Sequence, residues 1–451
     1  MPVKTRSKAP VKRTTTTTAK PRARGAKAQA NTQAITQAKV KALSSAQRRA
    51  AERFLLEITS LPTAAGREDR VIEAIERWVA QRHARVVLTR DKYGNLIVAS
   101  HKFRDACAHS AKHATAVKPV LITAHLDHPA FVVRAVRTQG ASAMVELEFR
   151  GGVHDPYFKG TAIEVFDGAT QRSFDAKIIS LDSAMDPATK PFKTVIAKLA
   201  DAKSAKHIAA GCIARWKLPA AEVVNGIAHT HACDDLAAVA AALLAYDTIS
   251  RDPSLAHVAL LFTRCEEIGF IGAIGAARAG TIAPGTRLLC LENSRSFPHD
   301  SPIGAGPIVR VGDRLSVFTP ELTNRVSTIA LEHQKARPAF KFQRKLMAGG
   351  ACEATAFASF GLNATCICLP LGNYHNMQDI DGVTTSNKRA RIGREFIAVA
   401  DFHGLVELLE ITVRRLDDAL ISNSHEALME RLWSTHKHHV GGSADGVRKH
   451  S

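Results

Sequence analysis

The segment that most constrains the fold is a short apolar run that ends in two adjacent carboxylates. Residues Val258 to Thr263 are apolar or β-branched, which predicts a buried strand. Glu266 and Glu267 follow, and the glycine- and alanine-rich sequence up to Ala279 predicts a helix. Open α/β sheets place their chemistry at the carboxyl ends of strands. Acidic residues are also common in the first turn of an ordinary solvated helix, so the pair alone leaves both interpretations open.

Neighbouring side chains project in different directions, so the two glutamates can have different roles. One can hold a metal ion while the other is the general base for the attacking water. A second predicted strand, residues 119–124, leads directly into His125 and Asp127. Residues two apart in extended backbone lie on the same side, so Asp127 can orient the His125 ring as carboxylates do for ligand histidines.

Three further segments place potential metal ligands after a predicted strand or before a predicted helix. Asp234 and Asp235 precede an almost fully apolar helix that is expected to run to about residue 249. The strand expected at 287–291 ends at Glu292, and the strand at 365–369 leads to His375. Each feature alone is also consistent with a helix cap or a hydrogen-bonded histidine. Together they predict two imidazoles and several carboxylates at one end of a parallel sheet, a set that suits two Zn²⁺-like ions sharing a bridging carboxylate.

The pattern along the chain predicts an α/β fold: a sheet flanked by helices, with an inserted β-rich domain. Amphipathic helices are expected at about 45–60 and 67–82, and a last long helix at about 387–421. From about residue 129 to 225, short alternating strands separated by Gly, Asp and Ser predict the insert. The predicted domains are a disordered basic tail (1–45), a catalytic domain in two parts (46–128 and 226–425), the β insert (129–225) and a flexible tail (426–451). The insert is expected to serve oligomerisation or to gate access of the substrate, with a simple lid as the alternative.

The basic N-terminal segment accounts for most of the charge imbalance. Residues 1–45 hold 11 Lys and Arg and no Asp or Glu, against a net charge of +19 for all 451 residues. Such a segment cannot bury apolar surface and is expected to be disordered. It can bind nucleic acid through its charge, act as a transit-type peptide, or simply be a solubilising extension. No apolar run is long enough for a membrane span, and eight scattered Cys favour a reducing compartment, the cytoplasm.

The order of these motifs resembles the tetrahedral, glutamyl-aminopeptidase-like family of co-catalytic metallo-aminopeptidases, within the zinc-peptidase clan. The resemblance covers most of residues 45–415. It rests on these stretches: Tyr93-Gly94-Asn95-Leu96, Ala124-His125-Leu126-Asp127, Asp234-Asp235, Glu266-Glu267-Ile268-Gly269, Gly306-Pro307, and Gly349-Gly350 with Glu353-Ala354. The insert also lies where that family carries its dimerisation domain.

The resemblance implies a role for each candidate residue. His125 and Glu292 would each bind one metal ion, Glu267 and His375 the other, and Asp234 would bridge both, with a cis peptide bond to Asp235. Asp127 would support His125, and Glu266 would be the general base. The cofactors would be two divalent ions per chain, Zn²⁺ with Co²⁺ or Mn²⁺ as alternatives.

The sequence departs from the family pattern at several positions. His128 stands where the family usually has Glu, Glu292 where it usually has Asp, Leu236 in place of an Arg, and Asn373-Tyr374 in place of Arg-Tyr. The ligand set is nevertheless complete.

We therefore expect an aminopeptidase that hydrolyses N-terminal residues from short peptides and forms a homo-oligomer through its β insert. The alternatives are a related amide hydrolase, an N-acyl amino acid deacylase, and an inactive scaffold that binds nucleic acid through the basic tail.

Overall fold

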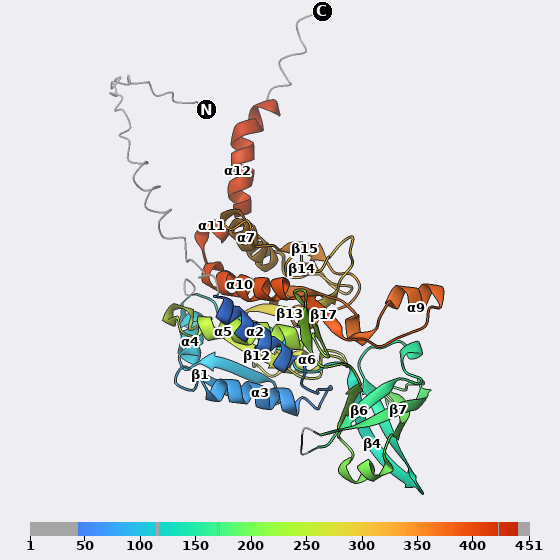
Figure 1. Cartoon of the computed structure of the whole chain (residues 1–451). Helices are drawn as coiled ribbons and strands as arrows, with labels where there is room; N and C mark the ends of the chain where they lie inside the picture. Colours follow the sequence, from blue (N-terminus) through green and yellow to red (C-terminus); the bar gives the residue numbers. More distant parts are fainter. Residues whose placement is uncertain (1–43, 114–116, 169, 171, 423, 441–451) are drawn as a thin grey trace, which may run out of the picture. The chain divides into compact units, whose positions relative to one another are not determined.

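The computed structural model describes residues 44–440 except 114–116, 169, 171 and 423 (Figure 1). The predicted basic tail lies outside the described residues, apart from residues 44 and 45. None of the described helices is long and apolar enough to cross a membrane.

An eight-stranded mixed sheet forms the centre of the catalytic part. Its strand order is β1-β2-β12-β3-β13-β16-β14-β15. The bounds are β1 (Val86–Arg90), β2 (Leu96–Ser100), β3 (Val120–His125), β12 (Val258–Thr263), β13 (Arg287–Arg295), β14 (Ile308–Gly312), β15 (Gln343–Leu346) and β16 (Asn363–Leu371). The adjacent strands β12, β3, β13 and β16 are parallel and almost wholly buried, so their carboxyl ends meet at one edge.

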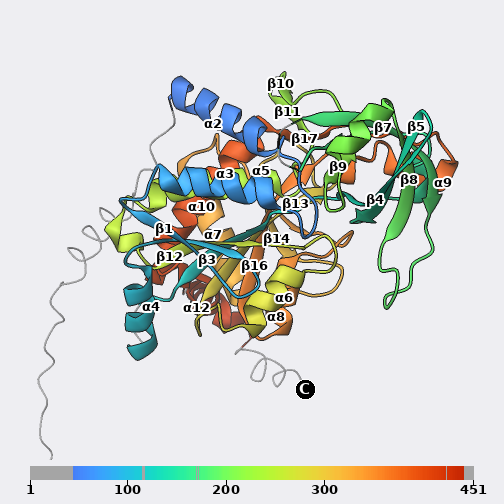
Figure 2. The ribbon, with the colours of Figure 1, turned by 90° about the horizontal axis from the view of Figure 1, so that it is seen from below.

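Helices cover both faces of this sheet (Figure 2). The bounds are α2 (Ser45–Ile58), α3 (Asp69–Ala80), α4 (Phe103–Lys112), α5 (Leu236–Ile249), α6 (Ile271–Arg278), α7 (Pro320–Ala336), α8 (Glu353–Ser359), α9 (Ile380–Ser386), α10 (Val399–Arg415), α11 (Ala419–Ser422) and α12 (Ser424–His436). Helix α5 is buried on nearly all sides and packs on β3, β12 and β13. Helices α6 and α8 pack on the sheet through an apolar cluster that includes Leu261, Ala273 and Phe357.

The β-rich insert is a closed antiparallel barrel of order β4-β5-β8-β7-β6-β9. The bounds are β4 (Ala130–Gln139), β5 (Ser142–Arg150), β6 (Ala162–Phe166), β7 (Ser173–Asp182), β8 (Lys193–Leu199) and β9 (Ile213–Trp216). Phe131, Phe149, Phe158 and Trp216 pack against one another in its core. The fold class is thus the predicted one, an α/β sheet with an inserted β domain.

One predicted helix is partly wrong. Residues 387–394 are not helical, and Glu395–Ala398 form strand β17 of a small sheet with β10 (Glu222–Val224) and β11 (Ile227–Thr230). The polar sequence of 387–394 carries no apolar helical period, and β17 is fixed instead by antiparallel pairing with the distant β11. Residues 424–436, most of which were assigned to a tail, form helix α12.

Candidate metal centre

The predicted ligand residues converge at the carboxyl edge of the four parallel strands. His125 is the last residue of β3, Glu266 and Glu267 follow β12, and Glu292 lies within β13, which continues past the predicted end to Arg295. Asp234 precedes α5, and His375 lies in a short 3-10 turn, Tyr374–Asn376, after β16. Relative exposure is at most 8% for His125, Asp234, Glu266, Glu292 and His375.

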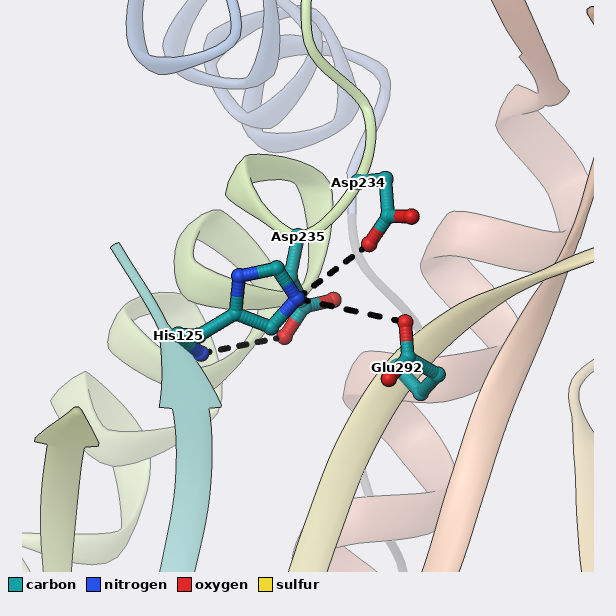
Figure 3. Close-up of side chains that lie close together, drawn as sticks. All are labelled: His125, Asp234, Asp235 and Glu292. Carbon is teal, nitrogen blue, oxygen red and sulfur yellow. Dashed lines mark hydrogen bonds and ion pairs between the residues drawn. The ribbon is translucent and has the colours of Figure 1, made fainter. Parts of the chain in front are cut away.

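Asp234 lies between the two histidines. The Nε2 atom of His125 is 3.3 Å from Oδ1 of Asp234, and the Nε2 atom of His375 is 3.4 Å from Oδ2. Each histidine also has a glutamate beside it: His125 Nε2 is 3.9 Å from Glu292 Oε1, and His375 Nε2 is 3.6 Å from Glu267 Oε1. Figure 3 shows the His125 side of this arrangement, with the Asp234 and Glu292 carboxylates both directed at the imidazole.

The unpaired atoms of this cluster fit a cation. Oδ1 of Asp234 and Oε1 of Glu267 are buried and have no hydrogen-bond donor. Oxygens and imidazole nitrogens of His125, Asp234, Asp235 and Glu292 lie within 4.8 Å of one another, as do those of Asp234, Glu267 and His375. Buried, unpaired carboxylate oxygens are costly unless a donor or cation compensates them, so both groups have the composition of a divalent metal site.

Burial and mutual proximity also shift the pKa values of the carboxylates in this cluster. Burial and the nearby carboxylates raise the pKa of Glu266 and of Glu267 well above the usual range, and burial with the charge of Asp234 raises that of Glu292 to about 7. Burial also opposes the charge of Asp234, but the adjacent imidazoles of His125 and His375 outweigh it and lower the pKa of Asp234. The cluster therefore concentrates more negative charge than its two imidazoles neutralise, which favours a bound cation.

Asp127 acts on the turn that holds the two glutamates. Its carboxylate accepts the backbone N–H of Glu266 at 2.9 Å and that of Glu267 at 3.0 Å. The His125 Nδ1 atom lies 3.1 Å from the backbone oxygen of Asp127 and 3.8 Å from its carboxylate. The hydrogen-bond partner of the His125 ring is thus the Asp127 backbone oxygen, while the Asp127 carboxylate also lies beside the ring at 3.8 Å.

The same turn depends on a close backbone approach. A Cβ at Gly272 would lie 2.4 Å from the carbonyl oxygen of Arg264 and 2.7 Å from the side chain of Asn95. Only glycine at position 272 lets the start of α6 pack this tightly against the turn that carries Glu266 and Glu267.

The peptide bond between Asp234 and Asp235 is cis, as the resemblance implied. The Asp235 carboxylate is buried, and its Oδ2 accepts the backbone N–H of His125 at 3.3 Å. Asp235 therefore ties the start of α5 to the end of β3, and it stands in the first group of metal-binding atoms, where the sequence analysis gave it no role.

Sequence reasoning missed Glu395. This fully buried carboxylate accepts three backbone N–H groups, from Cys233 at 2.7 Å, Asp234 at 3.1 Å and His375 at 2.8 Å. It thereby joins the segments that carry the two residues Asp234 and His375. The local sequence gives no signal for Glu395, since the sequence predicts a helix there and the residue reaches the site only through the pairing of β17 with β11.

The residues that depart from the family pattern, among them His128 and Leu236, have different surroundings in the structure. His128 is buried and its Nδ1 is 2.5 Å from the backbone oxygen of Asp234, while its Nε2 is 3.1 Å from Oδ1 of Asn376. Burial and the nearby His375 lower the pKa of His128 to about 4, so its ring is neutral at pH 7. Leu236 is buried in α5, and the Tyr374 ring stacks on His375 with centroids 3.7 Å apart.

A cavity of about 860 Å³ opens onto the cluster. Its lining includes five residues of the cluster and two neighbouring segments: Asp234, Glu266, Glu267, Glu292 and His375, with Gly152 to His154 of the insert and Leu346 to Ala351. The insert also contacts a candidate ligand directly, since the backbone oxygen of Gly152 lies 2.6 Å from Nδ1 of His375. The β insert therefore shapes the site that the sheet supports.

Comparisons with known proteins agree with the fold and the site. A model of the M42 glutamyl aminopeptidase family matches residues 107–388. A comparison with curated protein sequences found no significant match.

Many solved structures share the fold, and three of them illustrate the similarity. The TET aminopeptidase of a marine sediment archaeon of the Thaumarchaeota is 17% identical, with a TM-score of 0.62, over 84% of this chain and 99% of its own. The Pyrococcus horikoshii TET1 peptidase is 21% identical, with a TM-score of 0.60, over 80% and 99%. An aminopeptidase from Desulfurococcus kamchatkensis is 17% identical, with a TM-score of 0.60, over 81% and 95%.

Proposed function

Because the chain belongs to the M42 glutamyl aminopeptidase family, a family of peptide hydrolases, we propose that it is a metal-dependent aminopeptidase acting on short peptides. The observation that carries this proposal is the position of Asp234, whose two carboxylate oxygens each face a different histidine. An aspartate in this position is suited to bridge two cations.

We assign the residues around that bridge to two ion sites. His125 and Glu292 would hold one divalent ion and His375 and Glu267 the other, with Asp234 shared between them. When bound, such ions supply Lewis acidity that polarises the scissile carbonyl and lowers the pKa of the attacking water. We propose Zn²⁺ as the native ion, with Co²⁺ or Mn²⁺ as substitutes.

The chain's own residues supply the proton transfers. Glu266 lines the cavity beside Glu267 and is the general base: it takes a proton from the attacking water and returns it to the leaving amine. Asp127 holds Glu266 in place through the backbone N–H groups of the turn. These side chains are largely buried, and electrostatic interactions between buried groups are stronger than in water.

The proposed assembly is a homo-oligomer formed through the β insert. The related Pyrococcus horikoshii peptidase can assemble into a tetrahedron or a large octahedral shell. The insert of this chain follows His128 directly and returns to the sheet before Asp234, so its position and that of the site are linked. All eight cysteines are free thiols, which supports a reducing compartment such as the cytoplasm.

The experiment compares parent and Glu266→Gln on amides with free and with acylated amino termini. An aminopeptidase cleaves the free dipeptide and leaves its N-acetyl form intact, whereas a deacylase does the reverse. Loss of the general base lowers kcat by at least ~10²-fold while the variant keeps its metal content and melting temperature. Near-parent turnover by the variant would exclude Glu266 as the base, and cleavage of acylated substrates alone would replace the aminopeptidase assignment by the deacylase.

A further inference from the structure

Helix α12 carries an apolar surface that the rest of the described chain does not cover. Every residue from His425 to Val440 is exposed except Leu428, which is half-buried. Met429, Leu432 and Trp433 are 55%, 44% and 57% exposed. These four side chains, Leu428, Met429, Leu432 and Trp433, form one stripe because positions three, four and five apart fall on one side of a helix. We call them the α12 stripe.

A helix of this length needs a packing partner. Helix α12 has 13 residues, and isolated helices of that size are marginal in water. Glu426 in the first turn and His436 in the last turn are residue types that suit the helix dipole, but at exposed positions such interactions stabilise a helix only slightly. Four apolar side chains on one side of an exposed helix therefore point to a docking surface.

The charges beside the stripe identify the partner. Glu426 and Glu430, four residues apart, lie on one flank of α12 next to Trp433, and Lys437 is the first residue of the 3-10 turn Lys437–His439 that directly follows the helix. Acidic residues thus stand toward the amino-terminal end of α12, and a basic residue stands just beyond its carboxyl-terminal end. If two such helices pack antiparallel, each flank meets the same flank reversed, and Glu426 of one helix faces Lys437 of the other.

We propose that the α12 stripe is a self-association surface, on which α12 of a second copy of this chain packs antiparallel. A two-fold contact of this kind places one patch against itself, so each apolar side chain meets another apolar side chain. This surface lies outside the β insert and the metal centre and does not depend on the proposed activity, but the expectation that it reinforces contacts elsewhere rests on the homo-oligomer proposed above.

The contact is small and acts together with other contacts. A 13-residue helix is about 20 Å long at 1.5 Å per residue, so the pair buries less than a standard-size interface. If two copies are already joined through another surface, their α12 helices are held at a high effective concentration, which makes the α12 contact more favourable. We therefore expect α12 to stabilise an assembly rather than to form a tight dimer alone.

The test measures molar mass by light scattering across a concentration series of the full chain. Leu432→Glu with Trp433→Glu places charge in the stripe and is expected to weaken the α12-dependent association at least ~10-fold, since buried aromatic anchors dominate such contacts. Ala427→Glu adds the same kind of charge on the opposite side of α12 and is expected to keep the parent mass. Peptidase activity stays unchanged in the variants, because α12 contributes no residue to the cavity.

A charge exchange tests whether the two helices pack antiparallel. At low salt, Glu426→Lys alone and Lys437→Glu alone are each expected to weaken association a few-fold, and the double exchange restores it. Misfolding of α12 cannot produce such a restoration. The proposal is overturned if the stripe variant has the parent's mass at every concentration, or if the double exchange is no better than the single changes. If the stripe variant has the parent's mass, the stripe would instead bind a different protein or residues 1–43 of this chain.

Discussion

Glu395→Gln tests whether a residue outside the ligand set positions the metal centre. The Glu395 carboxylate is buried on β17 and accepts N–H groups from Cys233 and Asp234 with Oε2 and from His375 with Oε1. Glutamine has the same shape but only one acceptor oxygen. That oxygen best serves the two donors of the Asp234 segment, so the amide NH₂ then faces the N–H of His375.

The cost follows from one unpaired donor. A buried N–H group without an acceptor costs about 1–3 kcal/mol, and the loss falls on the turn that carries His375. Changes to groups that orient metal ligands typically lower metal affinity about 10- to 100-fold. We therefore expect the ion held by His375 and Glu267 to be weakened by this factor, and the ion on the His125 side to be affected less.

The assay is a competitive Zn²⁺ titration of the metal-depleted protein against a chelator of known affinity, followed by kinetics at saturating metal. The variant is expected to lose affinity at one of two sites and to recover kcat to within a few-fold when metal is in excess. Glu222→Gln is the matched control, because Glu222 lies on the same small sheet with its side chain 54% exposed and paired to Arg394. Parent affinity at both sites in Glu395→Gln would refute the positioning role.

Three further outcomes are expected. Chelation should abolish activity and lower the melting temperature, and Zn²⁺, Co²⁺ or Mn²⁺ should restore both; full activity in a metal-free preparation would contradict this. Burial raises the pKa of Glu410 to about 7, so the folded state holds a proton that the unfolded state releases near pH 4.5, and the stability from this group falls as pH rises between those values. Glu410→Gln should therefore raise the free energy of unfolding by less than about 1 kcal/mol at pH 5 and by up to about 3 kcal/mol at pH 8 in denaturant titrations, and an equal effect at both pH values would disprove the shift. Deleting residues 1–43 should leave turnover unchanged because α2 begins at Ser45, and a large fall would show that this segment reaches the site.

The sequence alone predicts the elements whose pattern is local. The apolar runs before His125 and Glu266 identify buried parallel strands, since strands covered on both faces need apolar side chains on both. Alternation in residues 129–225 indicates the β insert. Ser44 or Ser45 indicates the start of a helix, and in the structure Ser44 is the N-cap of α2 and forms a capping box with Gln47. Because chemistry in such sheets lies at strand ends, the candidate ligands could be named before their distances were known.

The tertiary structure decided which atoms meet. That Asp234 turns one oxygen to each histidine depends on the order of β12, β3, β13 and β16 in the sheet, and strand order is not a local property. Glu395 enters the site only because β17 pairs with β11, more than 160 residues away in the chain. Local propensity cannot show such a pairing, since its free energy comes from long-range hydrogen bonds and burial and outweighs the weak helical preference of a short segment.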